Sequence, residues 1–190
     1  MGETVSPVLR KLLEERRILR SRTSSRMVAK ELKGSELDLA TAKASYEAGD
    51  HKWATVQAYY SIFHAARALL YNKGFRERSH RGLLKALAEL YSRNTLSDML
   101  VVFEESMSLR EDADYELVHS EQGAGEALED AEIFFERSKM ILRDSIDGHR
   151  RARVQGEDLL SYLEKSKDSR GAISKRTRKH QAPRGRRQKP

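Results

Sequence analysis

The sequence has no cysteine, only three prolines, and few aromatic residues, which make up 7% of its 190 residues. The absence of cysteine excludes disulfide bonds, thiol nucleophiles and cysteine-ligated zinc or iron–sulfur sites. No apolar run approaches the roughly 18 residues that a membrane span needs, and charged residues begin at Glu3. We therefore expect a cytoplasmic protein without membrane contact. The sequence also lacks a glycine-rich phosphate loop and any metal-ligand spacing, so we expect neither a cofactor nor a metal.

The net charge of +7 is concentrated at the C-terminus. Residues 169–190 carry nine basic and no acidic side chains, whereas the rest of the chain carries 27 basic and 29 acidic ones. The basic residues include Lys175, Arg176, Arg178, Lys179, Arg184, Arg186 and Arg187. We predict that this tail is disordered and contacts nucleic acid through its charge; a purely solubilising tail is the alternative.

Abundant alanine, leucine, glutamate and lysine favour helix, and the glycines fall where helices would end. The expected helices cover residues 4–20, 25–48, 51–72, 79–93, 95–118 and 123–147. Amphipathic helices with short connections predict an all-α, antiparallel up-and-down bundle of about five helices. The expected divisions are an N-terminal helical extension (1–24), the bundle (25–147), a short helical extension (148–168) and the tail (169–190).

The expected helix over residues 51–72 has apolar residues, Trp53 among them, on two faces, as the central helix of a bundle does. Its third face is a polar stripe made by Gln57, Ser61, His64, Ala68 and Tyr71. We expect this stripe to face solvent, with a dimer seam or a ligand wall as the alternative. His64 is expected to have a structural role.

Thr95 and Asp98 resemble a capping box at the start of the expected helix 95–118. One face of this helix is formed by Phe103, Met107, Arg110, Asp114 and Leu117. The opposite charges of Arg110 and Asp114 interrupt its apolar residues. Two interpretations are open. The pair is either a buried salt bridge that fixes the register of the helix, or Arg110 faces a cleft and binds an anion, since a guanidinium matches the planar geometry of a phosphate.

Three segments together resemble a known family: AYYSIFHAARALL (58–70) followed by Lys73-Gly74, SHRGL (79–83) and LREDADY (109–115). In order and spacing they closely resemble the HEPN domain (higher eukaryote and prokaryote nucleotide-binding), in its small stand-alone branch of archaea and bacteria. The resemblance covers about residues 30–145. It implies a helical bundle that forms a homodimer.

Many HEPN proteins are metal-independent ribonucleases and act as toxins that a nucleotidyltransferase partner neutralises. Their motif is an arginine, four to six residues and a histidine, with two copies meeting in a cleft across the dimer. Arg110 matches the arginine, but Tyr115 follows after four residues and His119 after eight. The candidate catalytic residues are therefore Arg110, Tyr115 and His119, and Asp114 is a candidate beside the phosphate.

A second group of candidate phosphate contacts lies where the expected helix 79–93 begins. His80 and Arg81 stand at its start and Arg76 precedes it, where helix N-termini favour anions. A capping region with solvated arginines is the alternative.

Two functions follow. The first is a HEPN protein that binds RNA or a nucleotide through Arg110, with metal-independent endoribonuclease activity of the toxin–antitoxin type left open. The alternative is a catalytically inert HEPN subunit that partners a nucleotidyltransferase or is modified by it, with Tyr115 as the acceptor.

Overall fold

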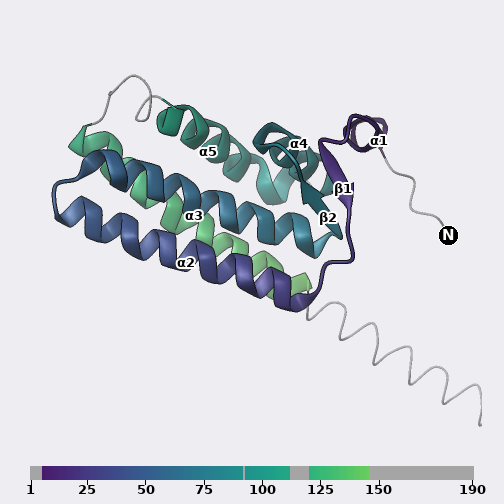
Figure 1. The fold of residues 1–190 in the computed structure, drawn as a ribbon, viewed down its shortest axis with the longest axis horizontal. Coiled ribbons are helices and arrows are strands. Elements are labelled where there is room, and N and C mark those ends of the chain that lie inside the picture. The colour runs from purple at the N-terminus through teal and green to yellow at the C-terminus, as the bar shows by residue number, and fades with distance from the viewer. Residues whose placement is uncertain (1–5, 92, 112–119, 146–190) are drawn as a thin grey trace, which may run out of the picture. The chain divides into compact units, whose positions relative to one another are not determined.

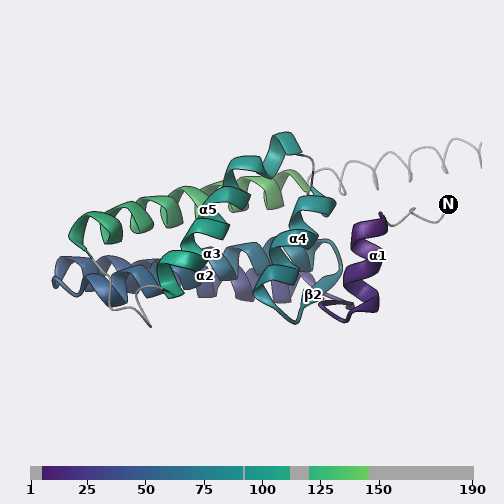
Figure 2. The same cartoon turned by 90° about the horizontal axis from the view of Figure 1, so that it is seen from above.

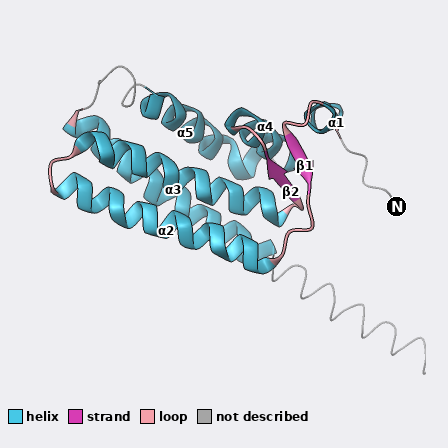
Figure 3. Ribbon diagram, in the orientation of Figure 1, coloured by secondary structure: helices cyan, strands magenta, loops and turns pink. Residues whose placement is uncertain are grey.

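The computed structural model describes residues 6–91, 93–111 and 120–145 (Figure 1). It contains six helices and two short strands, and the all-α bundle predicted from the sequence is confirmed (Figure 3). In chain order these are α1 (Pro7–Glu14), β1 (Ile18–Arg20), α2 (Ser25–Glu47), α3 (His51–Asn72), β2 (Phe75–Glu77), α4 (His80–Leu90), α5 (Arg93–Glu111) and a helix over residues 121–145. The chain divides into units over Met1–Arg143 and Asp144–Pro190, and the first holds the bundle, the strands and the candidate site.

The boundaries of α2 and α3 follow from capping residues and glycines, as predicted. The side chains of Ser24 and Asp50 accept hydrogen bonds from backbone N–H groups in the first turns of α2 and α3, at 3.3 Å in both cases. Gly49 and Gly74 follow the two helices with φ of 78°, a left-handed conformation that glycine adopts without steric cost.

The prediction of one helix over residues 4–20 is wrong in part. Helix α1 ends at Glu14, Arg16 takes a positive φ of 55°, and β1 then pairs antiparallel with β2, with Ile18 opposite Glu77 and Arg20 opposite Phe75. A three-residue strand is too short to show the alternation by which strands are recognised. The capping box is also wrong, because α5 begins at Arg93 and Thr95 lies inside it.

Helix α3 is the central element, as predicted, and it contacts α2, α4, α5 and β2 (Figure 2). Its polar stripe does not face solvent as expected: Ser61, Ala68 and Tyr71 are buried. The stripe meets polar groups of α2, with the hydroxyls of Ser61 and Ser35 3.1 Å apart and the Ser45 hydroxyl donating to Gln57 at 3.0 Å. Trp53, expected to face inward, is instead 51% exposed.

The N-terminal segment is packed onto the bundle. Leu9 and Leu12 of α1 and Ile18 of β1 belong to the same buried core as α3 and α4, and Ser6 donates a hydrogen bond of 2.5 Å to Glu89 of α4. None of the helices in the described ranges is long and apolar enough to cross a lipid bilayer. The expected extension over 148–168 and the basic tail lie outside the described residues.

Candidate nucleic-acid site

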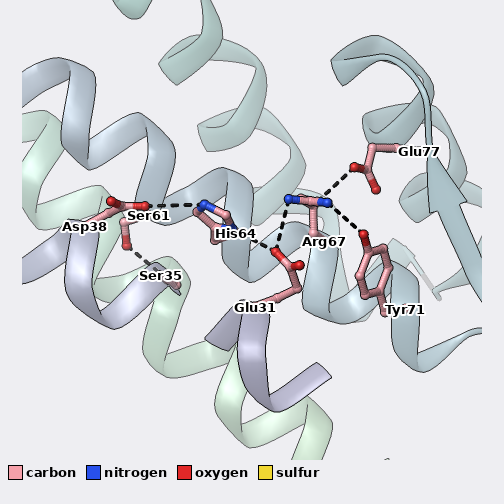
Figure 4. A network of polar contacts seen from close by, with 8 residues as sticks. All are labelled: Glu31, Ser35, Asp38, Ser61, His64, Arg67, Tyr71 and Glu77. Carbon is pink, nitrogen blue, oxygen red and sulfur yellow. Dashed lines mark hydrogen bonds and ion pairs between the residues drawn. The ribbon is translucent and has the colours of Figure 1, made fainter. Parts of the chain in front are cut away.

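Helix α3 contributes to two polar clusters, and the first is an ion-pair network, here called the Arg67 network (Glu31, His64, Arg67, Tyr71 and Glu77). Arg67 lies between two carboxylates, with Nη1 3.2 Å from Glu31 and Nε 2.8 Å from Glu77 (Figure 4). Its Nη2 donates to the Tyr71 hydroxyl at 2.7 Å, and Nδ1 of His64 donates to Glu31 at 2.8 Å. The network therefore joins α2, α3 and β2.

The charges of the Arg67 network stabilise one another against the cost of burial. Burial would raise the pKa of Glu31, but the hydrogen bond from His64 and the charge of Arg67 outweigh it and lower that pKa. Burial would likewise lower the pKa of Arg67, but the charges of Glu77 and Glu31 raise it. The contact of Arg67 Nε with Glu77 is an ion pair rather than a hydrogen bond, because Nε has no hydrogen-bond partner among the described residues. The guanidinium and both carboxylates of the network thus have partners of opposite charge within the fold.

The second cluster lies where α4 begins and is here called the Tyr59–His80 pair. Ser79 caps α4 by accepting a 3.0 Å hydrogen bond from the N–H of Gly82. The next residue, His80, has its Nδ1 2.5 Å from the hydroxyl of Tyr59, which is only 2% exposed. The ring of Phe63 lies against the His80 ring, with centroids 4.4 Å apart. A surface histidine is therefore held against α3 by two aromatic side chains.

Arg110 of α5 acts on this pair through its charge. Phe103 on the same face is fully buried, as predicted, while Arg110 is half-buried in the last described turn. Burial lowers the pKa of His80, and the positive charge of Arg110 lowers it further. Burial raises the pKa of Tyr59, and the charge of Arg110 opposes this rise. Arg110, His80 and Tyr59, from three different helices, thus share one electrostatic environment.

A cleft of about 350 Å³ lies between α4 and α5. It is lined by Arg81, Leu84, Lys85, Glu104, Met107, Ser108 and Glu111. Glu111, which lines the cleft, also acts on His80 through its charge. The cleft and the exposed His80 are therefore close to each other, and the cleft contains both charged and apolar side chains.

The model of the HEPN domain family matches residues 28–141 of the chain. The chain belongs to the HEPN family. Among its relatives, "Putative toxin MJ0605" of Methanocaldococcus jannaschii is 31% identical over 121 residues, which are 58% of this chain and 84% of the relative. A "UPF0332 protein" of Archaeoglobus fulgidus is 35% identical over 101 residues, 52% and 81% of the two chains. "Putative toxin MJ0142" of M. jannaschii is 27% identical over 121 residues, 62% and 82%.

The predicted site residues of this HEPN domain fall into three groups. Arg110, His80 and Arg81 come together around the start of α4 and the cleft. Arg76 is exposed on β2, opposite Leu19, and does not line the cleft. The others lie outside the described residues, namely Asp114, Tyr115, His119 and the basic residues of the tail.

Sequence reasoning missed Tyr59 and Gly82 as parts of the candidate site. Tyr59 has the spacing of a core residue, and only the fold shows that its hydroxyl meets a histidine 21 positions away. Gly82 lies in the SHRGL segment that carries part of the family resemblance, and this was only a weak indication of a role in the site. A Cβ at this position would lie 2.8 Å from both the carbonyl oxygen of Arg17 and the hydroxyl of Ser79, so only glycine fits without a shift.

Proposed function

We propose that this HEPN protein binds RNA through its phosphates at the region formed by Arg110, the Tyr59–His80 pair and the α4 side of the cleft. The observation that carries the proposal is the convergence of Arg110 and His80 from α5 and α4. Burial lowers the pKa of His80 and the charges of Arg110 and Arg67 lower it further, so the ring is neutral and can donate a hydrogen bond to an anion beside the Arg110 guanidinium. A guanidinium adds a planar set of donors that suits a phosphate.

The charges that line the cleft favour one side of it. Arg81 and Lys85 extend from α4, whereas Glu104 and Glu111 extend from α5. We therefore expect phosphates to lie along α4, where the positive charges are adjacent. The apolar side chains of Leu84 and Met107 offer contacts for a base or a ribose in the same cleft.

The names of two relatives support a toxin-like role, and for this chain we propose a toxin with an antitoxin partner. Cleavage of the bound RNA without a metal is the enzymatic form of the proposal, with Tyr115 or His119 transferring the proton. A homodimer that brings two copies of the site together fits this role. The alternative partner is a nucleotidyltransferase that uses Tyr115 as its acceptor.

The test is binding of labelled single-stranded RNA by the full chain in EDTA, with wild type and Arg110→Ala. Loss of a charged hydrogen bond of about 1.5–3 kcal/mol predicts about 10- to 100-fold weaker binding. Arg137→Ala is the matched control, because Arg137 is 38% exposed, pairs with Asp98 at 3.7 Å and lies on another helix. The same gels report any cleavage products.

Two results would contradict the proposal. Equal RNA affinity of Arg110→Ala and wild type would exclude a phosphate contact by Arg110. If that variant also melted at a much lower temperature, Arg110 would instead be the register-fixing ion pair considered from the sequence.

For the tail, deletion of residues 169–190 is expected to flatten the dependence of log affinity on log salt. The slope should decrease by about 0.7 for each phosphate of a single strand that the tail neutralises in the full chain. An unchanged slope would exclude a role of the tail in binding.

A further inference from the structure

We infer that Tyr59 is a positioning residue that holds His80 in the tautomer with hydrogen on Nε2, so that His80 donates a hydrogen bond to an RNA phosphate. This inference rests on the proposed function and deepens it, because it assigns a donor atom and a residue that controls it. Tyr59 lies behind the histidine, and we do not place it in contact with RNA.

The hydrogen-bond inventory of the pair fixes the tautomer. The Tyr59 hydroxyl is buried, and the hydrogen-bond partner that the described residues give it is Nδ1 of His80, 2.5 Å away. A buried O–H needs an acceptor, and a neutral imidazole has one acceptor nitrogen and one donor nitrogen. When Nδ1 accepts from Tyr59, the hydrogen of the ring must be on Nε2.

The opposite arrangement is less favourable. If Nδ1 carried the hydrogen and donated to the phenol oxygen, the phenolic O–H would lose its acceptor in a buried position, at a cost of about 1–3 kcal/mol. The phenol cannot avoid this cost by ionising, because burial raises the pKa of Tyr59 above its ordinary value of 10.

The groups that face His80 keep it neutral. Arg110 and Glu111 face it from α5, Glu77 from β2, and Arg67 and Tyr59 from α3. Burial, Arg110 and Arg67 lower the pKa of His80 and together outweigh the two carboxylates, which raise it. The ring is therefore uncharged at neutral pH, and the Phe63 ring packed against it, with centroids 4.4 Å apart, restricts its rotation. Because His80 is exposed, its Nε2–H remains accessible to a ligand.

This assignment also limits the chemistry. A histidine with hydrogen on Nε2 and a hydrogen bond accepted at Nδ1 has no vacant lone pair, so it cannot remove a proton from a ribose hydroxyl. His80 therefore does not replace the histidine missing from the arginine–histidine motif. Any base for cleavage must come from another residue, of which Tyr115 and His119 are the candidates.

The test combines NMR of the histidine side chains with RNA binding at pH 7.5, on the full chain. In wild type we expect the ¹⁵N shifts of His80 to report hydrogen on Nε2, and in Tyr59→Phe a mixture of the two tautomers. RNA affinity should fall by about 3- to 10-fold in His80→Ala and by less in Tyr59→Phe, where part of the rings still carry hydrogen on Nε2. The double variant should bind no more weakly than His80→Ala, because both residues act through one contact. His80→Gln retains an amide donor and should bind more tightly than His80→Ala.

Tyr91→Phe is the matched control. Tyr91 also has a raised pKa, about 12, because it is buried, and its hydroxyl donates to the carbonyl oxygen of Leu69 at 2.9 Å. Its loss should affect stability as the loss of Tyr59 does, but neither the His80 tautomer nor RNA affinity.

Two outcomes would overturn the inference and are distinct from each other. If wild type binds RNA through Arg110 but Tyr59→Phe leaves the tautomer and the affinity unchanged, Tyr59 has no positioning role and the proposed function stands. If wild type binds no RNA, the proposed function fails, and with it the phosphate contact of His80.

Discussion

The Arg67 network and the Tyr59–His80 pair are built from similar residues of α3 and its neighbours, yet their charges are arranged in opposite ways. His64 and Arg67 each lie next to carboxylates, so the charged groups of the network have partners within the fold. His80 has a neutral phenol as its hydrogen-bond partner, and Arg110 is the charged group that most affects it. A cluster whose charges are paired within the chain stabilises the fold, whereas we propose that the neutral Tyr59–His80 pair beside the Arg110 guanidinium serves a ligand of negative charge.

The largest effect is expected from Arg67→Met, which removes the shared partner of Glu31 and Glu77. Both carboxylate side chains are only 10% exposed, so the free energy of unfolding should fall by about 3 kcal/mol. Urea denaturation measures this loss, and Arg137→Met, which removes a more exposed pair, should change stability by less than about 1 kcal/mol. If Arg67→Met and Arg137→Met lowered the free energy of unfolding equally, the Arg67 network would stabilise the fold no more than an exposed ion pair does.

Adding one methyl group next to each cluster should have different effects on stability and on RNA affinity. Gly82→Ala places a Cβ 2.8 Å from the Arg17 carbonyl oxygen and should cost about 1–3 kcal/mol through overpacking. Because Gly82 follows His80 by two residues, RNA affinity should also fall. Gly34→Ala places a Cβ 3.3 Å from the His64 ring and should cost less, without affecting RNA binding. Similar RNA affinities for the two variants would contradict the placement of the site at α4.

A smaller effect is expected at the buried hydroxyl pair beside the Arg67 network. Ser61→Ala leaves the Ser35 hydroxyl buried without its partner and should cost about 1 kcal/mol, whereas the double variant Ser35→Ala, Ser61→Ala should cost less than either single variant. A double-mutant cycle by thermal denaturation measures the coupling. Additive losses would show that this contact does not hold α2 to α3.

The smallest expected effect is the dependence of stability on pH, and the two clusters should contribute to it in different pH ranges. The pKa of His80 is lowered from 6.5, so its neutral form is favoured in the fold and stability should fall as the pH drops below about 6.5. The pKa of Glu31 is lowered from 4.5, so its contribution is present above about pH 4.5 and is lost below it. Melting temperatures of His80→Gln and Glu31→Gln between pH 3 and 8 should lose the first and the second dependence respectively. A single shared range would contradict this assignment.

The ends of α2 and α3 could be predicted from the sequence, because capping and positive φ depend on nearby residues such as Gly49 and Asp50. The end of α1 and the start of α5 could not. The direction of the polar stripe was predicted wrongly. Helical periodicity shows that Ser61 and His64 share a face, but not that α2 presents Ser35 and Glu31 to that face. Polar patterns indicate solvent only when no neighbouring element supplies matching groups.

The candidate site was predicted in parts. Arg110 and His80 were each identified as phosphate contacts from local pattern and family resemblance, but their shared environment depends on how α4 packs against α5 and α3. Tyr59 could not be predicted, because its contact with His80 requires the chain to turn at Gly74 and run through β2 before α4 begins.

The strand pair has a consequence for how the protein is synthesised. The carbonyl oxygen of Arg17, directly before β1, accepts a 2.8 Å hydrogen bond from the backbone N–H of Arg78 and lies against Gly82, so the amino-terminal segment supports the start of α4. Strand β1 leaves the ribosome about 55 residues before its partner β2, and α3 must emerge in between. Strand β1 therefore has no partner strand until β2 has been synthesised. The hydrogen bond from Arg78 to Arg17, which supports the start of α4 beside His80, can form only after that point.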